Sequence, residues 1–270
     1  MITKIVVCDH KHFKGEQELI PSKKVTMVIG DYGSGKTVLV SGIEEGFLEL
    51  PVGVVVEEDV NSNLAYLDLI FVSGEDLSRP DFLDRYSPYM QETELEKKKL
   101  CTEYLERLLA LYWSFGFSSP NSKLGNKPEE NEQTTLEFFS CPKDASLLSV
   151  GERTLLNFFS VLSIRAVVDQ SLPLVLDDPF SHLTKTRRKA MIQVIEQTLS
   201  QVIIFLAPAC RPEGYRPQTV YRLEKDLMTG KTKIIRDWLV KIQGHYSGVP
   251  ISITLDDIRL SNTPPEPEEI

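Results

Sequence analysis

The sequence lacks the features of a secreted or membrane-spanning protein. Its four cysteines, Cys8, Cys101, Cys141 and Cys210, form no CxxC pair, so they indicate neither a zinc site nor a disulfide framework. No apolar stretch reaches the roughly 20 residues that cross a bilayer, and the first residues lack the apolar core of a signal peptide. We therefore expect a soluble protein without a membrane partner, located in the cytoplasm or on the nucleoid, or in the nucleus of a eukaryote.

An excess of positive charge is also missing. The chain of 270 residues has 30 Lys and Arg against 39 Asp and Glu, which gives a formal net charge of -9, and its pI is near 5.1. This balance excludes a protein that coats nucleic acid through its overall field, so any DNA binding has to come from a local site. The length and the 41% of hydrophobic residues allow one α/β body with an inserted lobe.

Hydrophobic patterning predicts alternating strands and helices. β-branched or continuously apolar runs between polar residues predict strands, and apolar residues three and four apart predict helices. The expected strands are 2–8, 25–29, 53–58, 67–73, 172–178 and 201–207, followed by a hairpin over 219–240 that turns at 228–230. The expected helices begin near Lys36 and cover 91–113, 151–168 and 186–199. Polar composition predicts a mobile loop over 118–133 and a disordered tail.

Residues 30–37, GDYGSGKT, lie between the predicted strand 25–29 and the helix that follows. A glycine-rich turn in this position wraps backbone N–H groups around a phosphate, and the helix N-terminus adds a favourable dipole. We expect Lys36 to bridge the β- and γ-phosphates of ATP and the Thr37 hydroxyl to ligate Mg²⁺. An ordinary glycine-rich turn is the alternative. The predicted nucleotide-binding residues of this loop are Gly30, Asp31, Tyr32, Gly33, Ser34, Gly35, Lys36, Thr37 and Val38.

Two aspartates end the apolar run 173–178, PLVLDD. P-loop enzymes need a second carboxylate on the magnesium side, at the end of a buried strand. Asp177 is the predicted metal residue, and Asp178 is the predicted catalytic residue, together with Lys36, because it can orient or deprotonate the attacking water. A helix cap is the alternative interpretation of the Asp pair.

The segment 147–156, LLSVGERTLL, resembles the signature motif of ABC ATPases. In that superfamily the serine, the glycine and the helix N-terminus contact the γ-phosphate bound by the opposite subunit, and Ser149, Gly151 and Glu152 match these positions. Ser149 is equally suited to be the N-cap of the predicted helix, and one residue can serve both purposes. Further along, Ser181 and Leu183 match the D-loop that follows the catalytic carboxylate.

The N-terminus is similar to the SMC and RecF branch of this superfamily, with Phe13, Lys14 and Gly15 in register. Residues 71–85 and the pair Arg187–Arg188 also resemble RecF segments. The resemblance implies an α/β P-loop ABC-ATPase head: a mixed sheet with flanking helices, an N-terminal antiparallel β portion and a small helical lobe between Walker A and the signature. The stretch between these motifs is too short for a long coiled coil.

This resemblance divides the chain into an N-terminal ATPase lobe with Walker A, 1–75, and a helical insertion with a flexible loop, 76–140. A C-terminal ATPase lobe with the signature, Walker B and D-loop, 141–258, and a disordered tail, 259–270, follow.

Several positions depart from the family pattern. Tyr32 replaces a common asparagine, Asp178 replaces the glutamate of many relatives, and Thr184 replaces the D-loop aspartate. The histidine expected after the strand at 201–207 is absent, because Ala207 or Pro208 stands there. No Q-loop glutamine can be assigned, with Gln91 only a weak candidate.

The resemblance implies a slowly hydrolysing, ATP-binding ATPase that forms an ATP-dependent homodimer. It would act as a nucleotide switch in DNA repair or maintenance, or in a defence-type complex with a partner effector. ATP and Mg²⁺ are the implied cofactors. Residues 185–189, KTRRK, are the candidate contact to duplex DNA, and an exposed helix start is their alternative interpretation. The alternative functions are the ATPase subunit of an ABC transporter and a nucleotide-binding structural or regulatory protein with little hydrolysis.

Overall fold

The computed structural model describes residues 1–48, 53–58, 66–86, 88–89, 95–114, 148–198 and 201–237. The predicted loop at 118–133, the tail from 259 and the Q-loop candidate Gln91 lie outside these ranges. The predicted boundaries at 140 and 258 also lie outside them, so the division into lobes stays a prediction. Within the described ranges, no helix combines the length and the apolar character that crossing a membrane requires.

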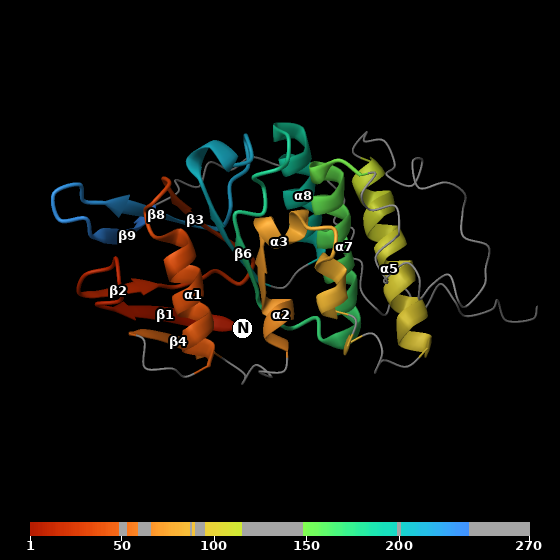
Figure 1. Ribbon diagram of the computed structural model, residues 1–270, viewed down its shortest axis with the longest axis horizontal. Coiled ribbons are helices and arrows are strands. Elements are labelled where there is room, and N and C mark those ends of the chain that lie inside the picture. Colours follow the sequence, from red (N-terminus) through yellow and green to blue (C-terminus); the bar gives the residue numbers. More distant parts are fainter. Residues whose placement is uncertain are drawn as a thin grey trace, which may run out of the picture.

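A six-stranded sheet forms the centre of the molecule (Figure 1). In spatial order its strands are β5 (Phe71–Ser73), β6 (Leu174–Asp177), β7 (Val202–Leu206), β3 (Val25–Gly30), β8 (Thr219–Lys225) and β9 (Thr232–Asp237). Neighbours pair in parallel except β8 and β9, which form the expected antiparallel hairpin. Every residue of β3 and β7 is buried, as is typical of parallel strands covered on both faces. The loops after β3 and β6 therefore leave the same edge of the sheet, on either side of β7.

A second, antiparallel sheet holds the N-terminus and confirms the expected antiparallel portion. Its order is β2 (Glu16–Leu19), β1 (Ile2–Cys8) and β4 (Val54–Glu58). The inner face buries Ile5 and Val7 completely, whereas the outer face carries charged residues such as Glu16 and Glu18. Helix α1 (Lys36–Phe47) packs against β4 and also against β6 and β7. It therefore joins the two sheets directly behind the glycine-rich loop.

Helix α7 (Val150–Val168) is the central helix, because it is buried on most of its faces. Figure 1 shows α5 (Leu95–Ser114) lying alongside it, and α8 (Lys185–Thr198) completes this layer. The inner side of α5 consists of buried residues, including Cys101, Tyr104, Leu105 and Leu108. The apolar stripe of this helix thus packs on its own domain.

The predicted strand at 67–73 is wrong in its first half. Leu67–Ile70 form the short helix α2, and only Phe71–Ser73 are a strand. A short apolar run has no period that separates a buried strand from a buried helical turn. In the structure the carbonyl of Leu69 accepts a hydrogen bond from the side chain of Arg165, rather than from a neighbouring strand.

The hairpin of β8 and β9 forms a hydrogen bond with the glycine-rich loop. The Thr232 hydroxyl donates a buried hydrogen bond of 2.9 Å to the Ser34 carbonyl, and the Thr232 N–H donates to the His12 carbonyl at 2.8 Å. Its turn lies at the predicted place, where the Asp226 carboxylate accepts the backbone N–H of Met228 at 2.8 Å. Three segments that are distant in sequence therefore fix one side of the loop.

Arg165 ties the helical layer to the sheet from inside the core. Its side chain on α7 is 1% exposed, and it donates to the carbonyls of Leu69, Leu172 and Pro173. Burial lowers the pKa of this guanidinium to about 10. The three carbonyls belong to α2, which leads into β5, and to the connection that leads into β6, so one side chain satisfies backbone groups at the start of two neighbouring strands.

Replacing this arginine tests its structural role. Arg165→Met leaves the three carbonyls without their donor, and we expect it to lower the free energy of unfolding by about 3 kcal/mol. Denaturant titration followed by circular dichroism measures the change. Arg79→Ala is the matched control, because Arg79 pairs with Asp81 at the exposed surface and such pairs contribute less than about 1 kcal/mol. Equal losses in the two variants would contradict the role of Arg165.

Candidate functional site

The loop between β3 and α1 has the backbone of a phosphate-binding loop. Gly33 and Gly35 have φ values of 75° and 90°, in the left-handed region that side chains disfavour. The Ser34 N–H donates to the Asp31 carbonyl at 3.1 Å, which closes the turn, and α1 begins immediately afterwards at Lys36. The backbone N–H groups of the loop and the helix N-terminus can therefore converge on one anion.

Lys36 lies at the centre of this loop and is only 9% exposed. Its ammonium donates to the carbonyls of Gly30 at 2.6 Å and Asp31 at 2.9 Å. The Tyr32 ring, which is 84% exposed, lies 5.6 Å from the same ammonium. Burial lowers the pKa of Lys36, and the nearby carboxylates of Asp178 and Asp177 oppose that shift. A phosphate that binds here has to replace these two carbonyl oxygens as the hydrogen-bond acceptors of the Lys36 ammonium.

Thr37 and Asp177 come together although they are distant in the sequence. The Thr37 hydroxyl donates to the Asp177 carboxylate, a contact that lowers the pKa of this acid, while burial raises it more strongly. Hydroxyl and carboxylate oxygens suit Mg²⁺, which usually takes its other ligands from water and phosphate. No group of three or more His, Cys, Asp or Glu side chains suited to a metal occurs in the described ranges. The pair therefore fits a magnesium ion that is shared with a nucleotide.

Asp178 is held in an unusual backbone conformation. Its φ is 48°, and its N–H donates to the Phe205 carbonyl at 2.8 Å. Gly74 packs so closely on it that an added Cβ would lie 2.0 Å from the Asp178 carbonyl oxygen. The carboxylate oxygen Oδ1 is buried and has no hydrogen-bond partner among the described residues. Because α8 begins only at Lys185, the helix-cap interpretation of the Asp pair does not apply to that helix.

The signature residues form the start of α7, and Ser149 is the N-cap of this helix, as its alternative interpretation predicts. Ser149 and Glu152 make a reciprocal capping box, in which the Ser149 N–H and hydroxyl donate to the Glu152 carboxylate at 3.0 and 2.7 Å. Gly151 lets the D-loop pack here, because an added Cβ would lie 2.9 Å from the His182 carbonyl oxygen. Ser149 and its neighbour Val150 remain exposed, so they are accessible to a partner.

The structure brings some of the predicted residues together and keeps others apart. The glycine-rich loop, Asp177 and Asp178 meet at one edge of the sheet. Figure 1 shows the starts of α1 and α7 at separate places along one side of the molecule. The site of a single chain therefore consists of the loop and the aspartates, without the signature.

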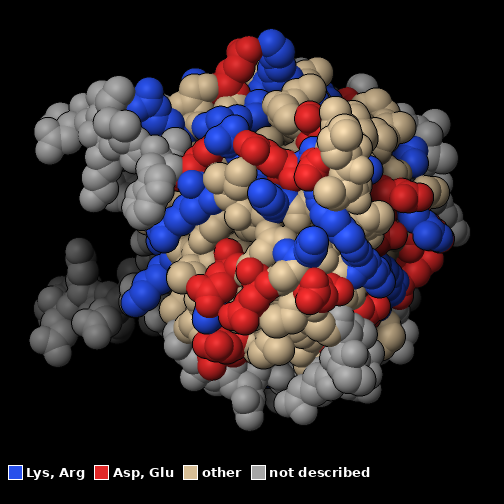
Figure 2. Space-filling model, turned by 90° about the vertical axis from the view of Figure 1, so that its left-hand side faces the viewer, with Lys and Arg blue, Asp and Glu red and all other residues tan. Residues whose placement is uncertain are grey.

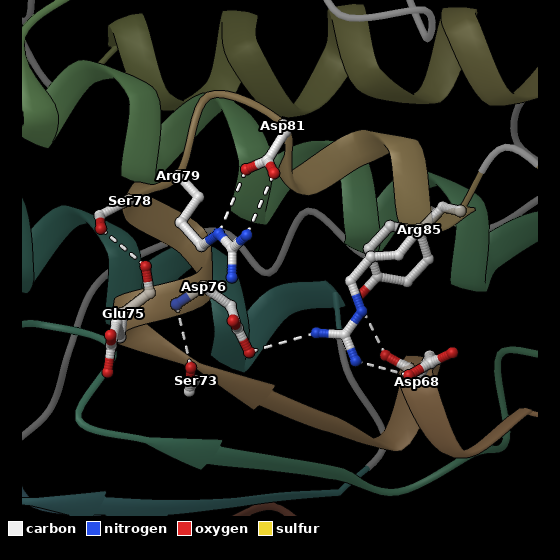
Figure 3. Close-up of polar contacts among 9 residues, drawn as sticks. Asp68, Ser73, Glu75, Asp76, Ser78, Arg79, Asp81 and Arg85 are labelled. Atoms are coloured by element: carbon white, nitrogen blue, oxygen red, sulfur yellow. Dashed lines mark hydrogen bonds and ion pairs between the residues drawn. The ribbon is translucent and has the colours of Figure 1, made fainter.

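Sequence reasoning assigned no site residue to the segment that follows β5. Ser73 lies opposite Asp177 in the parallel ladder, and its hydroxyl accepts the Asp76 N–H at 3.0 Å to cap helix α3 (Gly74–Ser78). Figure 3 shows Arg85 from the helical turn η2 (Phe82–Tyr86) bridging Asp76 and Asp68 at 3.2 and 2.6 Å. The one sequence signal for this segment was the expected resemblance of residues 71–85 to RecF, which stays a prediction.

Two cations of the basic cluster 185–189 form hydrogen bonds or an ion pair within the molecule. Arg188 donates to the carbonyls of Phe180, Leu183 and Ala209, at 3.1, 2.8 and 2.6 Å. Lys185 pairs with Glu213 at 2.7 Å. The cluster therefore supplies fewer phosphate contacts than its sequence suggests, because two of its cations already have partners within the chain.

The end of the molecule formed by the antiparallel sheet and the hairpin carries both signs of charge. Figure 2 shows Asp and Glu side chains gathered in the lower middle of this face, with Lys and Arg around them. The exposed acids of the small sheet include Glu16, Glu18 and Glu57. This face is thus no continuous basic surface, in keeping with the acidic composition.

The fold matches solved structures more clearly than the sequence matches any family. No protein-family model and no curated protein matches this chain. An SMC head domain from Thermotoga maritima aligns with a TM-score of 0.55 and 15% identity, over 88% of this chain and 99% of that chain. An SMC head bound to the C-winged helix domain of ScpA aligns with a TM-score of 0.56 and 13% identity, over 89% and 98%.

A RecF structure aligns with 14% identity over 87% of this chain and 98% of that chain, at a TM-score of 0.44. This value is too low to carry weight, so the RecF part of the resemblance stays a prediction. The SMC alignments cover nearly the whole of both chains and confirm the expected class. The protein has the α/β fold of the SMC head domains.

Proposed function

We propose that this protein binds ATP with Mg²⁺, hydrolyses it slowly and works as an ATP-dependent homodimer. The observation that carries the proposal is the convergence of four side chains, Lys36, Thr37, Asp177 and Asp178, at one edge of the sheet. Two of them belong to the glycine-rich loop and two to the end of β6. The two pairs are distant in the sequence, so it is the fold that brings them together.

Each of these side chains has a distinct task. Lys36 binds the phosphate oxygens in place of its present carbonyl partners. Thr37 and Asp177 hold Mg²⁺, which neutralises charge on the phosphates when it is bound. Asp178, whose carboxylate oxygen Oδ1 has no hydrogen-bond partner among the described residues, accepts a proton from the attacking water. Turnover is slow because an aspartate is one methylene shorter than the glutamate of many relatives.

The dimer is proposed because the start of α7, which carries the signature, lies apart from the start of α1 in one chain (Figure 1). Ser149 and Gly151 can contact a γ-phosphate only if a second copy presents them to the nucleotide on the first. ATP then favours the closed dimer, because both chains contact the phosphate that hydrolysis removes. The exposure of Ser149 and Val150 supports this arrangement, since nothing within the described chain covers them.

We propose that the dimer acts as a nucleotide switch in the cytoplasm or on the nucleoid. Its target is either duplex DNA, in DNA maintenance or repair, or an effector protein in a defence-type complex. The mixed charge of the face in Figure 2 favours a protein partner, and an SMC head of this fold has been solved with a protein partner, a domain of ScpA. A nucleotide-binding regulator with little hydrolysis is the second candidate, which the shorter Asp178 favours.

ATP binding is tested at the loop. Lys36→Ala removes a charged donor from the phosphates, and we expect ATP to bind at least ~10-fold more weakly. Isothermal titration calorimetry with Mg-ATP measures the dissociation constant. Lys97→Ala is the matched control, because Lys97 is exposed on α5. Equal affinities of the Lys36→Ala variant and the wild type would refute the nucleotide site.

Dimerisation is tested with a chain that binds ATP but does not hydrolyse it. We expect Asp178→Asn to form a stable dimer with Mg-ATP, as measured by light scattering after size exclusion. Adding Ser149→Asp to this chain should abolish the dimer, because the new charge meets the γ-phosphate of the partner. Adding Ser149→Asn should preserve it, since Asp and Asn cap helices about equally well.

Mixing variants separates a shared site from two independent ones. Chains with Lys36→Ala and chains with Ser149→Asp should each be inactive alone. Their mixture should recover part of the wild-type ATPase rate, since one of the two shared sites is then intact. A monomeric Asp178→Asn chain with ATP, or a mixture without activity, would exclude the shared site.

Duplex DNA is tested as the partner in the same assays. If DNA is the target, it should change the size or the ATPase rate of the dimer, and this effect should weaken as salt rises. The double variant Arg187→Ala/Lys189→Ala should then reduce the salt dependence, by a logarithmic slope of about 2. The control is Lys97→Ala/Lys98→Ala on α5. A dimer whose size and rate ignore DNA would leave the effector protein as the partner.

A further inference from the structure

Thr232 is the first residue of β9, and it belongs to none of the motifs that the sequence shows. It lies almost 200 residues after the glycine-rich loop, yet its hydroxyl donates to the Ser34 carbonyl of that loop at 2.9 Å. Thr232 is 1% exposed and Ser34 is 2% exposed. Water therefore has little access to this carbonyl, and Thr232 supplies its donor.

This hydrogen bond sets the orientation of the peptide between Ser34 and Gly35. In a trans peptide the carbonyl and the N–H that follows it point in opposite directions. The Ser34 carbonyl points to the hairpin, so the Gly35 N–H points away from it. Gly35 has a φ of 90°, and a glycine adopts φ values of the opposite sign about as readily. The stereochemistry of Gly35 therefore allows this peptide to turn over, and the buried hydrogen bond opposes the turn.

The orientation of this peptide matters because the loop binds a phosphate through backbone N–H groups. With the peptide turned over, the loop would present the Ser34 carbonyl oxygen to the phosphate in place of the Gly35 N–H. A favourable contact with an anion would then become a repulsive one. The side chain of Thr232 thus determines whether this peptide attracts or repels a phosphate.

Thr232 is itself held in place by further hydrogen bonds. Its N–H donates to the His12 carbonyl at 2.8 Å, and its carbonyl accepts the side-chain amide of Gln17 at 3.0 Å. The side-chain oxygen of Gln17 accepts the N–H of Ile234 at 2.6 Å. Strand β9 also pairs with β8, which pairs with β3. The hydroxyl of Thr232 therefore has a fixed place relative to the strand from which the loop leaves.

We infer that Thr232 is a positioning residue for nucleotide binding, whose hydroxyl keeps the Gly35 N–H turned towards the phosphates. This role rests on the ATP binding proposed above and adds to it a residue from the other end of the described chain. Thr232 contacts no phosphate itself. It acts through the Ser34 carbonyl, so it affects how well the loop binds a nucleotide and leaves the hydrolytic groups unchanged.

A variant of nearly the same shape removes the hydroxyl. We expect Thr232→Val to bind Mg-ATP ~10-fold more weakly, because a hydrogen bond to a charged group is weakened. ADP should lose affinity by the same factor, since the N–H groups of such a loop contact the α- and β-phosphates, which both nucleotides contain. Isothermal titration calorimetry measures the two dissociation constants. In the ATPase assay KM should rise and kcat should stay unchanged.

Three further variants separate positioning from a general loss of stability. Thr232→Ser keeps a hydroxyl donor and should bind both nucleotides almost as tightly as the wild type. Thr232→Ala lacks the donor without adding a methyl group beside the loop, so it should weaken both nucleotides even if Thr232→Val does not fold. The matched control is Thr154→Val on α7, because Thr154 is fully buried and its hydroxyl donates to the Val150 carbonyl at 2.8 Å. It should lower stability and leave both dissociation constants unchanged.

The outcomes distinguish this role from the function on which it rests. Wild-type affinities in Thr232→Val and Thr232→Ala would overturn the positioning role alone. Equal losses in Thr232→Ser and Thr232→Val would do the same, as would a fall in kcat at an unchanged KM. A wild type that binds no Mg-ATP would instead overturn the proposed function, and this inference with it.

Discussion

The hydrogen bond from the Asp178 N–H to the Phe205 carbonyl is the junction on which the site depends. It continues the parallel pairing of β6 with β7 by one residue beyond the last ladder pair, Asp177 with Phe205. At that point the chain adopts a φ of 48° and leaves the sheet towards the D-loop. Since β7 also pairs with β3, the glycine-rich loop lies on the other side of the same strand end. One register of three parallel strands thereby brings a lysine, a threonine and two aspartates together.

The electrostatics of the resting chain resist nucleotide binding at both halves of the proposed site. At the loop, Lys36 is occupied by the carbonyls of Gly30 and Asp31. At the signature, the N–H and the hydroxyl of Ser149 are occupied by the Glu152 carboxylate. In the proposed dimer, a γ-phosphate would have to take the Ser149 donors from a carboxylate of like charge. The proposed closed dimer would therefore be favoured only when both contacts form together, as a switch requires.

Local patterns were enough to predict the elements of the candidate site, and they were insufficient where a distant side chain determines the local structure. The glycine-rich loop, the Asp pair and the serine cap each have a signal within ten residues of sequence. The helix at Leu67–Ile70 had none, because Arg165, far along the chain, takes the carbonyl of Leu69. The sequence likewise shows the charge of Arg188, but not that three carbonyls use its donors. Composition predicts how many cations a segment has, and only packing determines how many remain for a ligand.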